Sequence, residues 1–308
     1  MDTKYDAEKA VQAFEARRKI ELANERITHV SRLTEKEGWE DWVEVLKLEN
    51  PSCWHMVKAT VGNREAQDMV EEYQLHIQGI LEDKRVPPIR GENNSQKKKQ
   101  HLRQSVTLGA FNSTKFMEDV DHILDVVALF ARHVPGIQQT AIRQVGEKTV
   151  VEVGNRIFMP KHEAPMMQGV EVDQLLDENG YITLVSRTDP GFVYGDENVV
   201  YYGEEKTEAD GVRRIINISQ QKFHVGNIVD VGFTVMGIGK GRETKARLIL
   251  RNMTLLNATH TQVGTGCCDK KTDGKVWLGM VERKSKESIE DRERRAGAYD
   301  EKEAGTGR

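Results

Sequence analysis

The sequence predicts an α+β protein, in which an N-terminal helical region precedes an antiparallel β-domain built as a sandwich or a small OB-like barrel. Two observations carry this prediction. Apolar residues recur at helical spacing in the first 145 residues. After Gly146 the chain changes to short runs rich in β-branched residues, separated by turns such as Asp189-Pro190-Gly191. Consecutive strands without intervening helices form antiparallel sheets.

The clearest predicted β-element is a hairpin over residues 223–257. Its two runs, 227–238 and 244–256, are rich in Val, Ile, Leu, Thr and Phe, which suit a half-buried pleated surface. The turn between them holds Gly239 and Gly241, which permit the positive φ angles of a tight reversal. The other expected strands span residues 149–159, 181–187, 199–202 and 213–219.

Helices are predicted over residues 1–35, 39–46, 64–81 and 113–133. The first is expected to be a packed amphipathic helix, with a coiled coil as the alternative. Its expected apolar stripe consists of Ala13, Ala16, Ile20, Ala23, Ile27 and Val30. The last has the most regular helical periodicity of the chain and ends at Pro135-Gly136.

The predicted organisation has five parts. They are a helical region (1–89), a basic linker or loop (90–106), a helical segment packed on the β-domain (107–145), the antiparallel β-domain (146–262) and a polar tail (263–308). The tail is expected to be disordered, because its single aliphatic residue after position 281, Ile289, cannot offset the entropy of ordering.

Composition indicates an intracellular protein, cytoplasmic or nuclear. The three cysteines, Cys53, Cys267 and Cys268, are an odd number and include an adjacent pair, which argues against a disulfide framework. No apolar run approaches the roughly 18 to 20 residues of a membrane span, and no targeting segment is expected at the N-terminus. With a net charge of −4, any attraction to nucleic acid must come from a local patch.

Basic residues gather on and beside the hairpin. Because side chains alternate along a strand, Lys245, Arg247 and Arg251 are expected on one face. Such a face can follow a nucleic-acid backbone, as in OB-type modules, although an ordinary solvated face is the alternative. The predicted nucleic-acid contacts are Lys240, Arg242, Lys245, Arg247 and Arg251, together with the run Lys97, Lys98 and Lys99. The aromatic residues available nearby for base stacking are Phe223, Phe233, Tyr201 and Tyr202.

No catalytic residue, metal site or cofactor is predicted. The glycines around Lys240 lack the spacing of a phosphate loop and precede a strand rather than a helix. Adjacent cysteines at 267 and 268 are poorly placed to share a metal. Cys53 and His55 are expected to be structural. The sequence therefore favours a binding protein over an enzyme.

A protein–protein adaptor or scaffold is the alternative function. In that case the N-terminal amphipathic helices, over residues 7–33, would pack against a partner protein or a second copy of the chain.

Two segments of the hairpin resemble a sequence pattern in uncharacterised proteins of mushroom-forming fungi. They are Val225-Gly226-Asn227-Ile228-Val229-Asp230-Val231 and the run from Arg247 to Asn257. Asn227 and Asn257 depart from the pattern, which has Asp at both positions. That group has no established activity, so the resemblance implies a β-domain binding module and assigns no site.

Overall fold

The computed structural model describes residues 5–22, 28–49, 51–59, 70–89, 99–209, 211–239, 243–260 and 284–285. The chain is α+β, as predicted, and is dominated by one sheet of eleven strands. Its α-helices are α1 (Ala7–Leu22), α2 (Val30–Thr34), α4 (Thr114–His133) and α5 (Tyr181–Thr188). The same ranges also contain the 3-10 helices η1 (Trp39–Trp42), η3 (Asp196–Asn198) and η4 (Gln220–Lys222).

The strands come from both halves of the chain. In the first half they are β1 (Val43–Glu49), β2 (Ser52–Lys58), β3 (Val70–Glu71), β4 (Leu75–Arg85), β5 (Arg103–Gly109), β6 (Gln138–Gln139), β7 (Ile142–Val145) and β8 (Lys148–Arg156). In the second half they are β9 (Met159–Pro160), β10 (Phe192–Val193), β11 (Tyr201–Thr207), β12 (Arg213–Asn217), β13 (Ile228–Ile238), β14 (Lys245–Asn257) and β15 (Lys284–Ser285).

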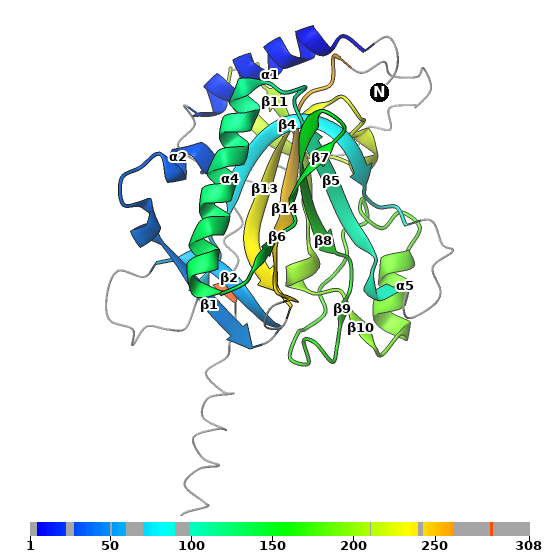
Figure 1. Cartoon of the computed structure of the whole chain (residues 1–308). Helices are drawn as coiled ribbons and strands as arrows, with labels where there is room; N and C mark the ends of the chain where they lie inside the picture. Colours follow the sequence, from blue (N-terminus) through cyan, green and yellow to red (C-terminus); the bar gives the residue numbers. More distant parts are fainter. Residues whose placement is uncertain are drawn as a thin grey trace, which may run out of the picture.

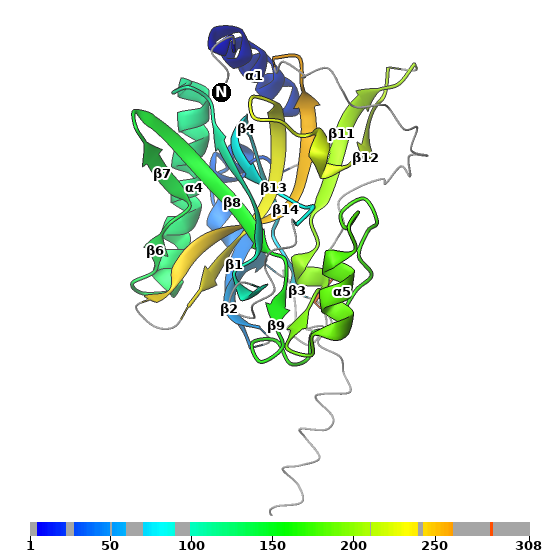
Figure 2. The same cartoon turned by 90° about the vertical axis from the view of Figure 1, so that its right-hand side faces the viewer.

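The main sheet has the order β12-β11-β14-β13-β4-β5-β8-β7, and the β1–β2 hairpin joins it at β13. Most pairs are antiparallel, whereas β11 and β6 run parallel to β14. The sheet curls, so that β8 comes close to β14 and Asn155 Nδ2 donates to the Leu250 carbonyl at 3.3 Å. Figure 1 shows α4 in front of the sheet, where it contacts β4, and α1 across the top, and Figure 2 shows β8 passing close to β14.

One face of the sheet forms the apolar core. On β13 and β14 the core side chains are Val229, Val231, Phe233 and Val235 paired with Leu255, Met253, Leu250 and Leu248. Helix α4 adds a buried stripe of Phe116, Val120, Ile123 and Val127, as its periodicity predicts. Each fully buried side chain of this size contributes about 1.5–3 kcal/mol through removal from water.

Helix α1 packs through a different stripe from the expected one. Ala10, Phe14 and Arg18 are its buried residues, whereas Ala16 and Ile20 are exposed. Phe14 meets Phe116 of α4 edge to face. The chain's own sheet and α4 therefore occupy this face of α1. Docking of another protein or a second copy through residues 7–33 stays a prediction.

The expected helix over 64–81 is wrong where the structure describes it, because residues 75–81 belong to strand β4. β4 lies between β5 and β13, and every residue from Leu75 to Leu81 is buried. A strand covered on both faces loses its period-two pattern, and its apolar run cannot be told from a helix by periodicity. The expected helix over 39–46 is likewise wrong: η1 gives way to strand β1 at Val43.

The expected strand over 181–187 is helix α5 instead. The carboxylate of Asp177 accepts hydrogen bonds from the backbone amides of Ile182 at 2.9 Å and Thr183 at 2.8 Å. These bonds satisfy amide groups that the first turn of a helix leaves free, and they outweigh the β-branched composition of the segment.

The expected linker over 90–106 is wrong at its end, since Arg103 begins strand β5. Residues 90–98 lie outside the described residues, as does the predicted tail apart from β15. The hairpin of β13 and β14, strands β8 and β12, and helix α4 are found where they were predicted.

Candidate nucleic-acid interface

The hairpin of β13 and β14 has an outer face opposite the apolar core. Lys245 pairs across the hairpin with Ile238, and Arg247 pairs with Met236. Lys245 is exposed and Arg247 is half-buried. Within the described ranges, neither cation has a carboxylate within ion-pair distance. The two predicted cations therefore lie together on one face with their charge uncompensated.

Arg251 does not lie on this exposed face, which corrects the prediction. The register shifts between Gly232 and Phe233, so Arg251 is an extra residue with no partner on β13. Its side chain is 2% exposed. Nε donates to Glu72 at 2.9 Å, and Nη2 donates to Glu197 at 2.7 Å. Two carboxylates thus neutralise this guanidinium, and it is unavailable to a phosphate.

Beyond Arg247 the outer face is closed by a small apolar cluster. Ile249 and Met236 pack there against Cys53 of β2. The Cys53 Sγ lies 3.0 Å from His55 Nε2. Burial raises the pKa of the thiol to about 12, and burial lowers the pKa of the imidazole. Both groups are therefore neutral at physiological pH, so the pair is no thiolate nucleophile.

The predicted lysine contacts are only partly described. Lys99 forms an ion pair with Asp189 at 2.7 Å, and both side chains are largely buried. The Lys99 ammonium is therefore engaged within the protein and is unavailable to a phosphate. Lys97, Lys98, Lys240 and Arg242 lie outside the described residues.

Two arginines that were not predicted extend the outer face across β5 and β8. Arg103 is the Cα partner of Arg156. Arg247 and Arg156 both act electrostatically on Arg103 and so lie near it. We call Arg103, Arg156, Lys245 and Arg247 the basic face. Of these, Arg156 is paired within the described chain, with Glu163 at 2.6 Å.

The expected stacking aromatics do not line the basic face. Phe223, Phe233 and Tyr202 are buried in the core, and Tyr201 is half-buried. What the basic face offers is therefore charge and guanidinium geometry rather than an exposed aromatic platform.

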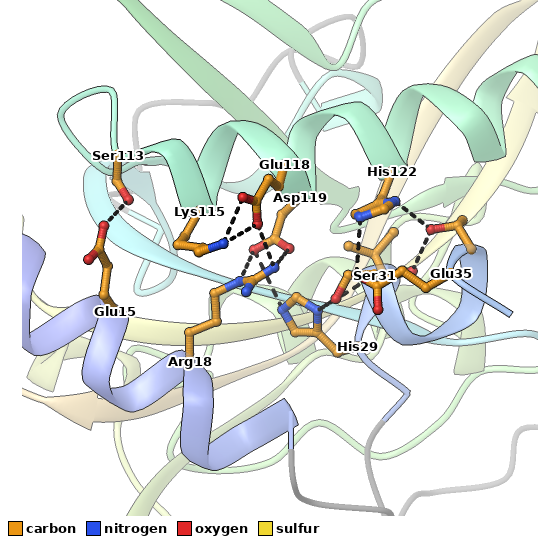
Figure 3. A network of polar contacts seen from close by, with 12 residues as sticks. Glu15, Arg18, His29, Ser31, Glu35, Ser113, Lys115, Glu118, Asp119 and His122 are labelled. Atoms are coloured by element: carbon orange, nitrogen blue, oxygen red, sulfur yellow. Dashed lines mark hydrogen bonds and ion pairs between the residues drawn. The ribbon is translucent and has the colours of Figure 1, made fainter.

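A second polar cluster joins α1, α2 and α4 (Figure 3). Arg18 binds Asp119 through two hydrogen bonds of 2.6 and 2.9 Å, and both side chains are buried. His29 lies 3.8 Å from the same carboxylate and contacts the Ser31 hydroxyl at 2.9 Å. Burial lowers the pKa of His29 to about 3. The cluster links the three helices. Because its side chains are buried, a macromolecule cannot contact them.

A hollow of about 250 Å³ lies elsewhere on the surface, between β11, β12 and the segment near Asp173. Tyr194, Tyr201 and Tyr202 line it together with Glu171, Asp173 and Asp196. Its carboxylates repel phosphate, so this hollow is unsuited to a nucleic-acid backbone.

Within the described ranges, no group of three or more His, Cys, Asp and Glu side chains is placed to hold a metal ion. Nor does any helix there have the length and apolar character to cross a membrane.

Comparison with known proteins gives distant likenesses to solved structures. No protein-family model matches the chain, and no curated protein sequence matches it. One similar solved structure is gp2.5, a single-stranded DNA binding protein encoded by bacteriophage T7, with a TM-score of 0.34, 10% identity and coverage of 64% of this chain and 99% of that one. Another is the single-stranded DNA-binding protein from bacteriophage Enc34 in complex with ssDNA, with a TM-score of 0.32, 9% identity and coverage of 64% and 95%. Likeness this low does not establish a shared fold.

Proposed function

We propose that this protein binds nucleic acid through the basic face, with the curled sheet working as an OB-like barrel. The observation that carries the proposal is uncompensated charge. Arg103, Lys245 and Arg247 have no carboxylate partner in the part of the chain that the structure describes. A protein with a net charge of −4 nevertheless keeps these cations together on adjoining strands. A polyanion gains from such a patch by releasing its counterions.

The arrangement is extended rather than point-like. Lys245 and Arg247 follow each other along the outer face of β14, and Arg103 continues it onto β5, whereas Arg156 on β8 is already paired with Glu163. Consecutive phosphates of one strand can therefore meet Lys245, Arg247 and Arg103. This distribution favours a nucleic-acid backbone over a single small anion.

Removing Lys245 and Arg247 together tests the proposal. Fluorescence anisotropy with labelled single-stranded and duplex oligonucleotides gives the affinity over a salt series. The double variant Lys245→Ala/Arg247→Ala is expected to bind a single strand about tenfold more weakly, because two phosphate contacts are lost. Its slope of log affinity against log salt is expected to fall by about 1.4, at roughly 0.7 for each contact.

The matched control is Lys115→Ala/Arg132→Ala, which removes the same charge from α4. Both residues are exposed and are paired with carboxylates, Lys115 with Glu118 and Arg132 with Glu40. This control is expected to bind like the native protein. Equal losses in the two double variants would show that net charge alone is responsible, and absence of binding at low salt would overturn the function.

A further inference from the structure

Arg103 lies at a fixed backbone position on strand β5. Gln104 and Asn155 are the next pair along β5 and β8, and both are buried. Gln104 Nε2 donates to the Asn198 carbonyl at 2.8 Å, and Asn155 Nδ2 donates to the Glu197 carbonyl at 2.7 Å. These bonds fix the two strands against η3. The adjacent Arg103 therefore sits at a rigid position on the opposite face.

The hydrogen-bonding capacity of Arg103 is almost unused. Among the described residues, its buried Nε has no hydrogen-bond partner. Its Nη2 donates to the Gly154 carbonyl at 3.4 Å. A guanidinium carries five N–H donors in a planar fork that matches two oxygens of a carboxylate or phosphate. Since Nε is shielded from solvent, the terminal nitrogens are the part of the fork that an anion can approach, and no carboxylate of the described residues pairs with them.

The nearby carboxylates are engaged by other arginines. Glu163 binds Arg156 at 2.6 Å, and Glu152 binds Arg143 at 2.8 Å. Burial, and next the charge of Arg247, lower the pKa of Arg103. A guanidinium nevertheless stays charged in proteins. The fold therefore maintains a half-buried cation next to a second uncompensated one, an arrangement that an incoming anion stabilises.

We propose that Arg103, assisted by Arg247, is a clamp for one phosphodiester of a single strand. This inference rests on the proposed function and names the chemistry of its central contact. Two non-bridging phosphate oxygens fit the guanidinium fork, whereas an ammonium is a point charge without that geometry. Because Arg103 is half-buried, a flexible single strand reaches it more closely than the phosphates of a rigid duplex.

The variant Arg103→Lys distinguishes bidentate phosphate binding from attraction by charge alone. The full-length variant keeps the charge, and its affinity for a labelled oligothymidine is expected to fall about tenfold through loss of the bidentate contact. The matched control is Arg143→Lys, since Arg143 lies nearby on β7 and is already paired with Glu152. That control is expected to stay within about twofold of the native affinity. Inorganic phosphate as competitor distinguishes the two sources of the anion: displacement of the oligonucleotide at equal concentrations of phosphate groups would mean a site for free phosphate and overturn the clamp.

Arg103→Met checks that the role is binding rather than folding. Removing an unpaired half-buried cation is expected to leave the thermal midpoint unchanged or higher while oligonucleotide affinity drops. A marked fall in the midpoint would show that Arg103 supports the fold and would overturn the clamp. If Arg103→Lys binds like Arg143→Lys while Lys245→Ala/Arg247→Ala is weak, only the clamp is wrong. If the native protein binds no oligonucleotide at low salt, the proposed function fails, and the clamp fails with it.

Discussion

Arg251→Met is expected to lower the free energy of unfolding by about 3 kcal/mol, because it leaves two carboxylates facing each other without their cation. Arg251 is 2% exposed and is held between Glu72 and Glu197, whose side chains are 12% and 29% exposed. Breaking a buried ion pair by removing one partner costs about 3–5 kcal/mol, and the partial exposure of Glu197 favours the lower end. Urea denaturation of the full-length protein measures the change.

Arg247→Met is the matched control for Arg251→Met. It makes the same chemical change on the same strand, at a half-buried cation without a carboxylate partner among the described residues. It is expected to change the free energy of unfolding by less than about 1 kcal/mol. Similar effects of the two variants would contradict the structural role of the Glu72–Arg251–Glu197 network.

The contrast between these two arginines shows where sequence reasoning reaches its limit. Alternation along β14 correctly places Lys245 and Arg247 on one face. It fails at Arg251, because one extra residue in a strand reverses the facing of everything beyond it. Nothing local in the sequence marks this bulge. The carboxylates that bind its guanidinium, those of Glu72 and Glu197, come from distant segments of the chain.

Arg251 was predicted as a contact and is not exposed, whereas Arg103 is a candidate contact that the sequence does not predict. It follows a run of lysines and amides, and that composition predicts a linker. The alternation of Ser105, Val106, Thr107 and Leu108 was a signal for a strand, but the polar Gln104 on the core side obscured its beginning. Arg103 has no carboxylate partner among the described residues because Glu163 pairs with Arg156 and Glu152 pairs with Arg143. Such a balance of charges exists only after folding.

An element is predicted correctly where a signal for it survives in the sequence. Helix α4 keeps one side toward water, so its periodicity is visible. β13 has no such side, but its length, its β-branched residues and its glycine-rich turn identify it. β4 has neither signal: both of its faces are covered and no tight turn adjoins it, so its apolar run predicts a helix.

Acidification from pH 7.5 to 5 is expected to destabilise the protein, in part through His29. Burial lowers its pKa to about 3 in the folded chain, against about 6.5 when unfolded. Between these values the unfolded chain binds one proton more, so stability is complete above pH 6.5 and falls as the pH decreases. At about 1.4 kcal/mol per pH unit, His29 accounts for roughly 2 kcal/mol at pH 5. The groups facing it are Arg18 on α1, Asp119 and His122 on α4, His76 on β4 and Asp230 on β13.

His29→Asn isolates this contribution. The His29 Nδ1 accepts from the Ser31 amide at the start of α2, and an asparagine oxygen can replace it there without titrating. Other groups also titrate: burial lowers the pKa of His55, and burial raises the pKa of Asp119, which has the opposite sign. Subtracting the urea-denaturation curves of variant and native protein at each pH largely cancels these contributions. The variant is expected to have the shallower pH dependence, whatever its absolute stability. Parallel profiles would mean that His29 takes up a proton in the folded protein. The conclusion that this histidine is buried in its neutral form would then be wrong.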